Sequence, residues 1–386
     1  MKNLSPNIFK YYIWRFINGF YFIYALQAIY LLSKGITPIQ LGIFASATSI
    51  CATIMEIPTG YVADKFSRRV SVSIGFFVSS LAFLGLIFVS NFYNLLLISF
   101  LMGLAQALKS GATESLIYDD LKQSASESEY LKVSSRGSTL GTIAGGLASF
   151  VGPLLYVINT GIPFLLTAIP HLFLAFYILR FDEQKKPSEV GNAIEIFDGV
   201  KSIVKNKNVR MLLLMDILLL TIVIIFYQTL YAPKINSLGL DIKYLGVLDT
   251  INLGLMSALL AILPKIVFKN KSYSLILYSL LPIIAFILFG LTNSLIFAIA
   301  FGIVFDLSWT ARNHIVPTIL NEFFSSKDRA LSLSSSSFIS GLGAAILVPL
   351  SLIILKVSYL FALIPALIII FILFFYTRTE NSPTSN

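Results

Sequence analysis

The stretch Gly60-Tyr61-Val62-Ala63-Asp64-Lys65-Phe66-Ser67-Arg68-Arg69 is a short charged segment between two long apolar runs of the chain. The runs cover residues 39–62 and 70–90, and each has about the 20 apolar residues that a helix needs to cross a bilayer. Charged side chains are costly inside the hydrocarbon layer, so the segment between the runs is a loop in water. The sequence therefore predicts two membrane-spanning helices joined by a tight polar loop.

The composition extends this prediction to the whole chain. Of the 386 residues, 56% are hydrophobic and 12% are charged, whereas soluble domains carry about 25% charged residues. The single cysteine, Cys51, allows no internal disulfide. These values exclude a soluble enzyme, a disordered chain and a secreted disulfide scaffold, and they favour a polytopic helical membrane protein.

Apolar runs of membrane-spanning length recur along the sequence. We count twelve: 11–32, 39–62, 70–90, 94–118, 138–158, 162–180, 211–232, 244–267, 274–292, 295–318, 331–354 and 358–377. The first run is too long for a signal peptide, so we interpret it as the first transmembrane helix. The sequence predicts an all-α fold with six-helix bundles at 1–180 and 211–386 and a cytoplasmic linker at 181–210.

The basic residues indicate the orientation in the membrane. Most of the 28 Lys and Arg residues fall in segments on one side of the predicted spans. The loops on the other side hold only Lys34, Lys234, Lys243 and Lys356. Because basic loops stay in the cytoplasm, we expect both termini to be cytoplasmic in a bacterial inner membrane. This bias also accounts for the net charge of +9, so we expect no nucleic-acid binding.

The two halves of the sequence repeat weakly. Gly35-Ile36 and Leu41-Gly42-Ile43 recur as Gly239-Leu240 and Leu245-Gly246-Val247. Two further sets recur in the same order: Gly103, Ala112 and Leu121 as Gly302, Ala311 and Leu320, and Gly145, Ala148, Pro153 and Leu154 as Gly341, Ala344, Pro349 and Leu350. A duplicated six-helix unit is typical of transporters that bind their solute near the membrane midplane, between the repeats.

The charged loop resembles a known motif. Gly60, Asp64, Lys65, Arg68 and Arg69 fit the signature G-x-x-x-D-[RK]-x-G-R-[RK] of the major facilitator superfamily, and only Ser67 departs from it. The resemblance implies that this loop helps to close the cytoplasmic side of a twelve-helix transporter. The alternative is a basic loop that only sets the topology.

The fifth predicted span carries a second partial resemblance. Gly145 and the step Gly152-Pro153 are similar to the glycine-rich fifth helix of the superfamily's antiporter branch, although no Gly-Gly pair follows the proline. A stripe of small residues for helix packing explains these glycines equally well. The arginine that the export branch often has early in span four is absent here, since Ser99 lies near that position.

Ionisable residues inside predicted spans are functional candidates because the membrane makes them costly. Asp306 lies near the centre of span ten, and Lys109 lies slightly to the inside of the centre of span four. These spans are related by the repeat and line the cavity in the family. We therefore expect a Lys109–Asp306 pair across the halves, in which one partner holds a substrate charge or Asp306 carries the coupling proton. The alternatives are that the pair is only a static salt bridge, or that Lys109 extends to the interface.

A second layer of charges lies nearer the cytoplasm: Arg15, Glu56, Glu114, Asp216 and Arg312. Buried carboxylates can exchange protons near neutral pH, so the proton-coupling candidates are Asp306, Glu56, Glu114 and Asp216. Neutralisation by Arg15 and Arg312 in structural ion pairs is the alternative. Asp249, in the outer third of span eight, ranks lower.

The first predicted span is rich in aromatic residues. Asn18, Tyr21 and Tyr24 follow one another at intervals of three, so they can share a cavity face. The substrate-cavity candidates are Lys109, Asn18, Tyr21, Tyr24, Gln27, Trp309, Arg15 and Arg312. Aromatic walls suit amphipathic or cationic ligands, whereas aromatic packing and interfacial belts are the alternative.

Several motifs are absent from the sequence. It has no P-loop for ATP, no Cys/His cluster for a metal and no nucleophile–base motif. We therefore expect no enzyme activity, no cofactor and no metal site, and any uphill transport must use an ion gradient, most simply of protons.

The leading functional prediction is proton-coupled export of a small amphipathic compound or drug by alternating access. The alternatives are proton-coupled uptake of a small polar or charged metabolite, and a membrane sensor or scaffold that transports nothing. The expected partners are a small-molecule substrate, protons and the lipid bilayer, and we expect the protein to act as a monomer.

Overall fold

The protein was analysed as a computed structural model that describes residues 6–65, 67–110, 129–183, 207–267, 271–323, 329–355, 365 and 367–370. Within these ranges every regular element is a helix. The structure therefore confirms the prediction of an all-α fold.

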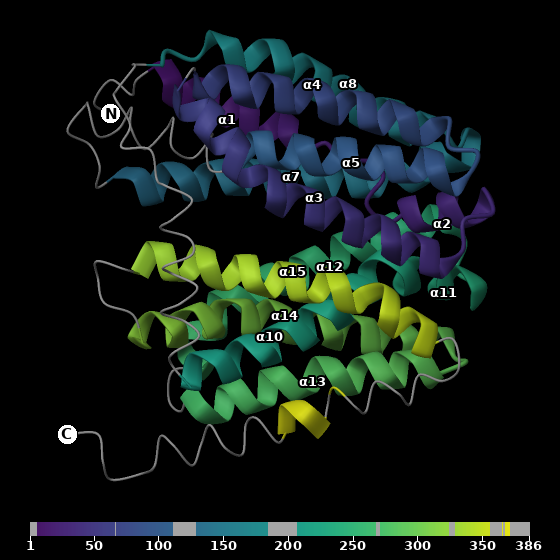
Figure 1. Ribbon diagram of the computed structural model, residues 1–386. Coiled ribbons are helices and arrows are strands. Elements are labelled where there is room, and N and C mark those ends of the chain that lie inside the picture. The colour runs from purple at the N-terminus through teal and green to yellow at the C-terminus, as the bar shows by residue number, and fades with distance from the viewer. Residues whose placement is uncertain are drawn as a thin grey trace. The chain divides into compact units, whose positions relative to one another are not determined.

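The helices of the N-terminal half follow the predicted order (Figure 1). They are α1 (Pro6–Asn18), α2 (Gln27–Ser33), α3 (Pro38–Lys65), α4 (Arg68–Ile87), α5 (Phe92–Lys109), α7 (Tyr130–Ile158), α8 (Ile162–Tyr177) and the short 3₁₀ helix η2 (Ile178–Arg180).

The elements of the C-terminal half also follow the predicted order. They are α10 (Lys207–Ile225), the π-helix η3 (Phe226–Leu230), α11 (Tyr231–Ser237), the 3₁₀ helix η4 (Ile242–Tyr244), α12 (Leu245–Val267), α13 (Lys271–Leu291), α14 (Leu295–Phe323) and α15 (Arg329–Leu355).

Nine stretches of the described residues are long and apolar enough to cross a membrane. They match the predicted spans two to seven and nine to eleven. The eighth predicted span is the 23-residue helix α12. Most of the twelfth, 358–377, lies outside the described residues.

The first predicted span is not one continuous helix, and this corrects the expectation for 11–32. α1 ends at Asn18, turns follow, and α2 begins at Gln27. A break in a membrane helix requires other partners for the freed backbone groups. Here the Phe22 N–H donates to Thr167 Oγ1 on α8 at 3.0 Å. Hydropathy does not reveal this break, because the interrupted residues are as apolar as the helix.

The repeat in the sequence has a counterpart in the structure. α2 and α11 are both seven residues long. Each is followed at the same interval by a glycine with positive φ, Gly35 at 84° and Gly239 at 105°. At these two turns a residue with a Cβ would be strained. The turns before α2 correspond to the π-helix before α11, so both halves interrupt their first span at matching positions.

The chain forms two compact units. One comprises Met1–Thr37, Ala47–Val190 and Asp241–Thr250, and the other comprises Pro38–Ser46, Gly191–Leu240 and Ile251–Asn386. The predicted bundle bounds, 1–180 and 211–386, stay a prediction because most of the linker at 181–210 lies outside the described residues.

Within the first unit, α4 runs beside both α5 and α8 (Figure 1). Trp14, Phe76 and Leu174 belong to one buried apolar cluster that joins α1, α4 and α8. On the outer face of α8, the large apolar side chains of Ile169 and Phe173 are exposed. Apolar side chains on both faces are what a helix between a protein core and lipid requires.

Candidate functional site

Among the described residues of the C-terminal half, the most enclosed acidic side chain is that of Asp306. It lies near the middle of the apolar stretch Leu295–Val316 of α14, and the residue is only 2% exposed. The Tyr227 hydroxyl donates a hydrogen bond to Oδ1, and the Asn252 amide donates one to Oδ2. Three different spans therefore meet at one buried carboxylate.

The local backbone presents these donors. Tyr227 lies on the π-helix that interrupts the seventh span, and single π-turns inside helices are frequent at functional sites. Its ring packs edge-on against Phe305 at 5.9 Å, beside Asp306. Asn252 lies on α12, where its side chain is buried.

A second buried charge in this half is the guanidinium of Arg312, also on α14. It is 1% exposed, and its Nη1 donates to Asp216 Oδ1 at 2.7 Å. Its Cζ lies 5.6 Å from the centre of the Trp309 ring. Nε and Nη2 have no hydrogen-bond partner within the described ranges. The structure thus brings together three of the predicted candidates, Asp216, Trp309 and Arg312. Asp216 and Arg312 form an ion pair.

Lys109 occupies a different environment in the N-terminal half. From the end of α5 its Nζ donates to Ser79 Oγ at 2.6 Å and lies 5.0 Å from the centre of the Phe76 ring. Ser79 lies near the middle of α4, so the ammonium extends toward the centre of the span and does not reach back to the interface. No carboxylate among the described residues forms an ion pair with it.

The predicted Lys109–Asp306 pair stays a prediction. In the structure each of the two side chains has hydrogen-bond partners from its own half of the sequence: Ser79 for Lys109, and Tyr227 and Asn252 for Asp306.

Two other charges of the layer that was predicted nearer the cytoplasm, Arg15 and Glu56, have hydroxyl partners. Arg15 Nη2 donates to Ser138 Oγ at 2.9 Å, and Ser110 Oγ donates to Glu56 Oε1 at 2.7 Å. Glu56 is exposed. Glu114 lies outside the described residues. Arg312 therefore neutralises Asp216, as the alternative of a structural ion pair predicts. The described contacts of Glu56 include no arginine.

The polar and aromatic candidates of span one do not share one face. The Tyr21 ring packs edge-on against Phe83 of α4 at 5.4 Å, whereas Tyr24 is 59% exposed. Asn18 ends α1 and Gln27 begins α2, and both are half-buried. The helix break between them explains the divergence, since intervals of three align side chains only within a continuous helix.

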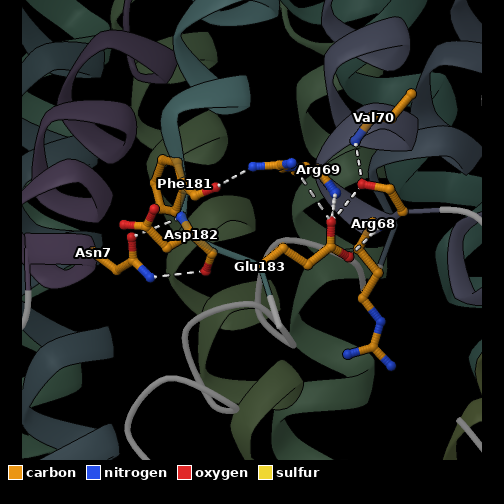
Figure 2. A network of polar contacts seen from close by, with 8 residues as sticks. Asn7, Arg68, Arg69, Val70, Phe181, Asp182 and Glu183 are labelled. Atoms are coloured by element: carbon orange, nitrogen blue, oxygen red, sulfur yellow. Dashed lines mark hydrogen bonds and ion pairs between the residues drawn. The ribbon is translucent and has the colours of Figure 1, made fainter. Parts of the chain in front are cut away.

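The charged loop between α3 and α4 is held by an acidic residue that follows span six (Figure 2). Glu183 accepts a hydrogen bond from the Ser67 hydroxyl, and it accepts the Arg68 N–H at 2.6 Å and the Arg69 N–H at 3.4 Å. A carboxylate stabilises the positive end of a helix. Ser67, the departure from the family signature, also caps α4 by accepting the Val70 N–H at 3.3 Å.

The same network reaches the start of α1. Lys10 Nζ forms an ion pair with Asp182 Oδ2 at 2.8 Å, and Asn7 exchanges two hydrogen bonds with the Asp182 backbone. The hydrogen bond from Lys10 lowers the pKa of the Asp182 carboxyl below its ordinary value. Arg69 Nη1 donates to the Phe181 carbonyl at 3.0 Å. α1, α4 and the end of span six are thereby tied together (Figure 2).

Two further motif residues, Gly60 and Lys65, belong to α3. Gly60 faces open space, and Lys65 lies over the Tyr61 ring at 5.5 Å. Nothing is described of the side chain of Asp64, which belongs to α3.

The glycines of span five lie against the interrupted part of span one. A Cβ at Gly152 would collide with the Phe22 carbonyl oxygen, whereas one at Gly145 would make an ordinary contact with the Gly19 oxygen at 3.6 Å. Pro153 is buried inside α7. Close helix packing is thus sufficient to explain Gly152.

Sequence reasoning did not select Tyr227, Asn252, Ser79 or Glu183. Asn252 has a signal that was available, since it is a polar residue inside an apolar span. Tyr227 has no such signal in the sequence, because tyrosine is common in membrane helices. The π-turn that presents it does not change the hydropathy.

These features define a class of protein. Many helices of spanning length, first spans of both halves interrupted at matching positions, and a carboxylate buried at mid-span are the features of secondary membrane transporters. The chain belongs to the Major Facilitator Superfamily, because the model of that family matches residues 12–318. This is a family of multi-pass membrane transporters and not of enzymes.

Two relatives were found by sequence. An uncharacterized MFS-type transporter of Bacillus subtilis (strain 168), YxaM, is 26% identical over 257 residues, which are 63% of this chain and 61% of the relative. An uncharacterized MFS-type transporter of Methanocaldococcus jannaschii is 26% identical over 157 residues, which are 40% of each chain. The match therefore spans less than two thirds of the length of either relative.

Solved structures share the fold. The nucleoside transporter NupG has a TM-score of 0.80 at 15% identity, covering 98% of this chain and 100% of that chain. The D-xylose-proton symporter has a TM-score of 0.71 at 14% identity, covering 96% and 97%. A bacterial homolog to the human lysosomal transporter Spinster has a TM-score of 0.70 at 16% identity, covering 90% and 82%. At these identities the likeness concerns the fold alone.

Proposed function

We propose that this protein is a proton-coupled secondary transporter of a small organic solute, with Asp306 as the proton-binding group. The observation that carries the proposal is the buried Asp306 carboxylate at mid-span, with hydrogen-bond donors from two other spans. A charged group in such a place is costly unless it has a role or a partner.

The chemistry of a carboxylate explains how a proton could drive movement. An ionised carboxylate only accepts hydrogen bonds, so it accommodates both the Tyr227 hydroxyl and the Asn252 amide. A protonated carboxyl has no negative charge and has one O–H donor, so it accepts these two hydrogen bonds more weakly and can itself donate one. Because the two donors lie on different spans, the protonation state of Asp306 changes the contacts among three spans.

Export of an amphipathic compound is the direction we propose first. Its support is the aromatic cluster of the interrupted first span, where Phe16 packs edge-on against Phe20 at 5.1 Å and Phe20 stacks on Phe22 at 5.9 Å. All three rings are half-buried, and flat apolar surfaces of this kind suit aromatic or cationic solutes.

Uptake of a polar metabolite is the second candidate. The ion pair of Asp216 with the buried Arg312 favours it, because such a pair can exchange partners with a charged or hydroxylated solute. Two of the solved structures with the same fold are described as a nucleoside transporter and a D-xylose-proton symporter.

The test uses purified protein in liposomes that contain a pH-sensitive dye. Addition of each compound of a panel should move protons across the membrane for at least one compound, and Asp306→Asn should abolish that movement. The sign of the pH change separates export by antiport from uptake by symport.

Asp241→Asn is the matched control, because Asp241 is an exposed aspartate outside the spans and pairs with Lys243 at 3.1 Å. It should leave proton movement unchanged. Solute-driven proton movement that survives in Asp306→Asn would contradict the assignment of the proton site. Solute transport without any proton movement would contradict coupling to protons.

A further inference from the structure

One edge of the Arg312 guanidinium has no acceptor in the described part of the chain. The residue is only 1% exposed, and its Nη1 donates to Asp216 Oδ1 at 2.7 Å. Nε and Nη2 have no hydrogen-bond partner among the described residues. An enclosed N–H group without an acceptor is costly, so this edge calls for a group that those residues do not supply.

Nε and Nη2 form a matched pair of donors. In a planar guanidinium the Nε–H and one Nη2–H point in the same direction, so together they bind the two oxygens of a carboxylate. Nη1 does not belong to this pair, so the contact with Asp216 leaves the pair available. Arginine is preferred to lysine where a carboxylate is bound in this way, because an ammonium group lacks the fixed fork of donors.

The residues that hold this guanidinium come from one compact unit. Arg312 and Trp309 lie on α14 and Asp216 lies on α10, and all three belong to the unit that contains 191–240 and 251–386. The guanidinium Cζ lies 5.6 Å from the centre of the Trp309 ring. The ring and the ion pair orient the guanidinium before a ligand arrives, which lowers the entropy cost of binding.

The charges at this edge favour a ligand with a single negative charge. Asp216 already offsets the positive charge of Arg312, so a phosphate with two negative charges would be repelled more strongly than a carboxylate with one. A neutral carbonyl could accept the same hydrogen bonds, but more weakly than an ionised oxygen does. A carboxylate therefore fits both the paired donors and the charge.

We propose that the Nε–Nη2 edge of Arg312 binds the carboxylate of the transported solute, and that this solute is a small organic monoanion. The position suits the role, because Arg312 follows Asp306 by six residues on α14, about 9 Å along the helix axis. The inference rests on the proposed transport function and names the class of its solute. It leaves the coupling proton on Asp306 and the contact between Nη1 and Asp216 in place.

The test measures binding and does not need transport. The melting temperature of the purified full-length protein in detergent is recorded with benzoate, hexanoate, phenyl phosphate and the neutral benzamide. We expect the two carboxylates to raise the melting temperature more than phenyl phosphate and benzamide do. Arg312→Lys keeps a cation for Asp216 and removes the paired donors, so it should weaken the apparent affinity for benzoate about tenfold or more.

Two further variants serve as controls. Arg180→Lys changes an exposed arginine of η2 and should bind benzoate like the wild type. Asp216→Leu/Arg312→Met removes both charges of the ion pair, so it should fold and should fail to bind benzoate. A melting temperature of unliganded Arg312→Lys near that of the wild type establishes that this variant folds, and otherwise the double variant provides the comparison.

The inference is overturned if neither carboxylate stabilises the wild type more than benzamide does, or if phenyl phosphate binds more tightly than benzoate. It is also overturned if the folded Arg312 variants bind benzoate as the wild type does. Failure of the proposed function gives a different pattern: benzoate binds and depends on Arg312, but no compound moves protons. Conversely, proton movement with other compounds and no carboxylate binding leaves the coupling intact and removes the site.

Discussion

Two cations on the repeat-related spans α5 and α14 are held in different ways: Arg312 is buried, and Lys109 is half-buried. Arg312 on α14 meets a carboxylate, Asp216, at 2.7 Å. Lys109 on α5 meets only the hydroxyl of Ser79 and the ring of Phe76 among the described residues. One half of the sequence thus encloses a neutral ion pair, whereas the other encloses a single ammonium group.

This difference indicates that the charge of Arg312 stabilises the fold, whereas the charge of Lys109 is available for function. Breaking an enclosed ion pair leaves a charge without compensation and costs several kcal/mol. A lysine without a carboxylate gains little from its charge, since burial opposes it. The two cations should therefore respond to substitution in opposite ways.

The largest effect on stability is expected for Asp216→Ala. It leaves the 1% exposed guanidinium of Arg312 without its carboxylate, which should lower the free energy of unfolding by about 3 kcal/mol. Thermal or denaturant unfolding in detergent measures the loss. The double variant Asp216→Leu/Arg312→Met, which removes both charges, should recover most of it, and a double variant as unstable as the single one would contradict the ion-pair account.

The interrupted first span gives the next largest effect. Thr167→Val removes the hydroxyl that accepts the Phe22 N–H, and an enclosed N–H without an acceptor should cost about 2 kcal/mol. Thr229→Val in span seven is the matched control, because the Thr229 hydroxyl donates only to Ile225 O of its own span. The control should cost less than about 1 kcal/mol. Equal losses in unfolding experiments would show that the break in span one does not depend on Thr167.

Lys109→Met tests directly whether Lys109, unlike Arg312, has no carboxylate partner. The substitution keeps the length of the side chain and removes a charge that has no carboxylate partner in the described ranges. The free energy of unfolding should rise or should fall by less than about 1 kcal/mol. A loss near that of Asp216→Ala would mean that Lys109 pairs with a carboxylate, as the hypothesis of a Lys109–Asp306 pair requires.

The smallest effect concerns the surface ion pair of Lys10 and Asp182. The Asp182 side chain is 79% exposed, so removing the pair with Lys10→Met should cost less than about 1 kcal/mol. Since the folded state lowers the pKa of Asp182, this contribution is present above the ordinary pKa of an aspartate and disappears as the pH falls through the lowered value. Stability curves of wild type and Lys10→Met should converge in acid. Curves that diverge there would contradict the sign of the shift.

Features that depend on composition or local sequence could be predicted. Run length predicts the spans, and the paired glycines Gly35 and Gly239 belong to the sequence repeat and lie at matching turns of both halves. The charged loop could also be located, because its signature combines glycine and charge at fixed spacing.

Features that depend on which neighbour a side chain meets could not be predicted. Nothing in the sequence around Lys109 says that its ammonium extends toward Ser79 near the middle of α4. Glu183 falls in a polar segment where many carboxylates look alike, yet it is the one that binds the start of α4. Tyr21 and Tyr24 both lie in the non-helical break of span one, and hydropathy does not reveal the break because its residues are as apolar as those on both sides.

The central claim, that Asp306 binds the coupling proton, is tested most directly by infrared difference spectroscopy of the purified protein during a pH change. The account predicts a band of a protonated, enclosed carboxyl group that grows as the pH falls through the working range. This band should be absent from Asp306→Asn and unchanged in the control Asp241→Asn. A band of full size in Asp306→Asn would contradict the account, because the exchanging proton would then reside on another group.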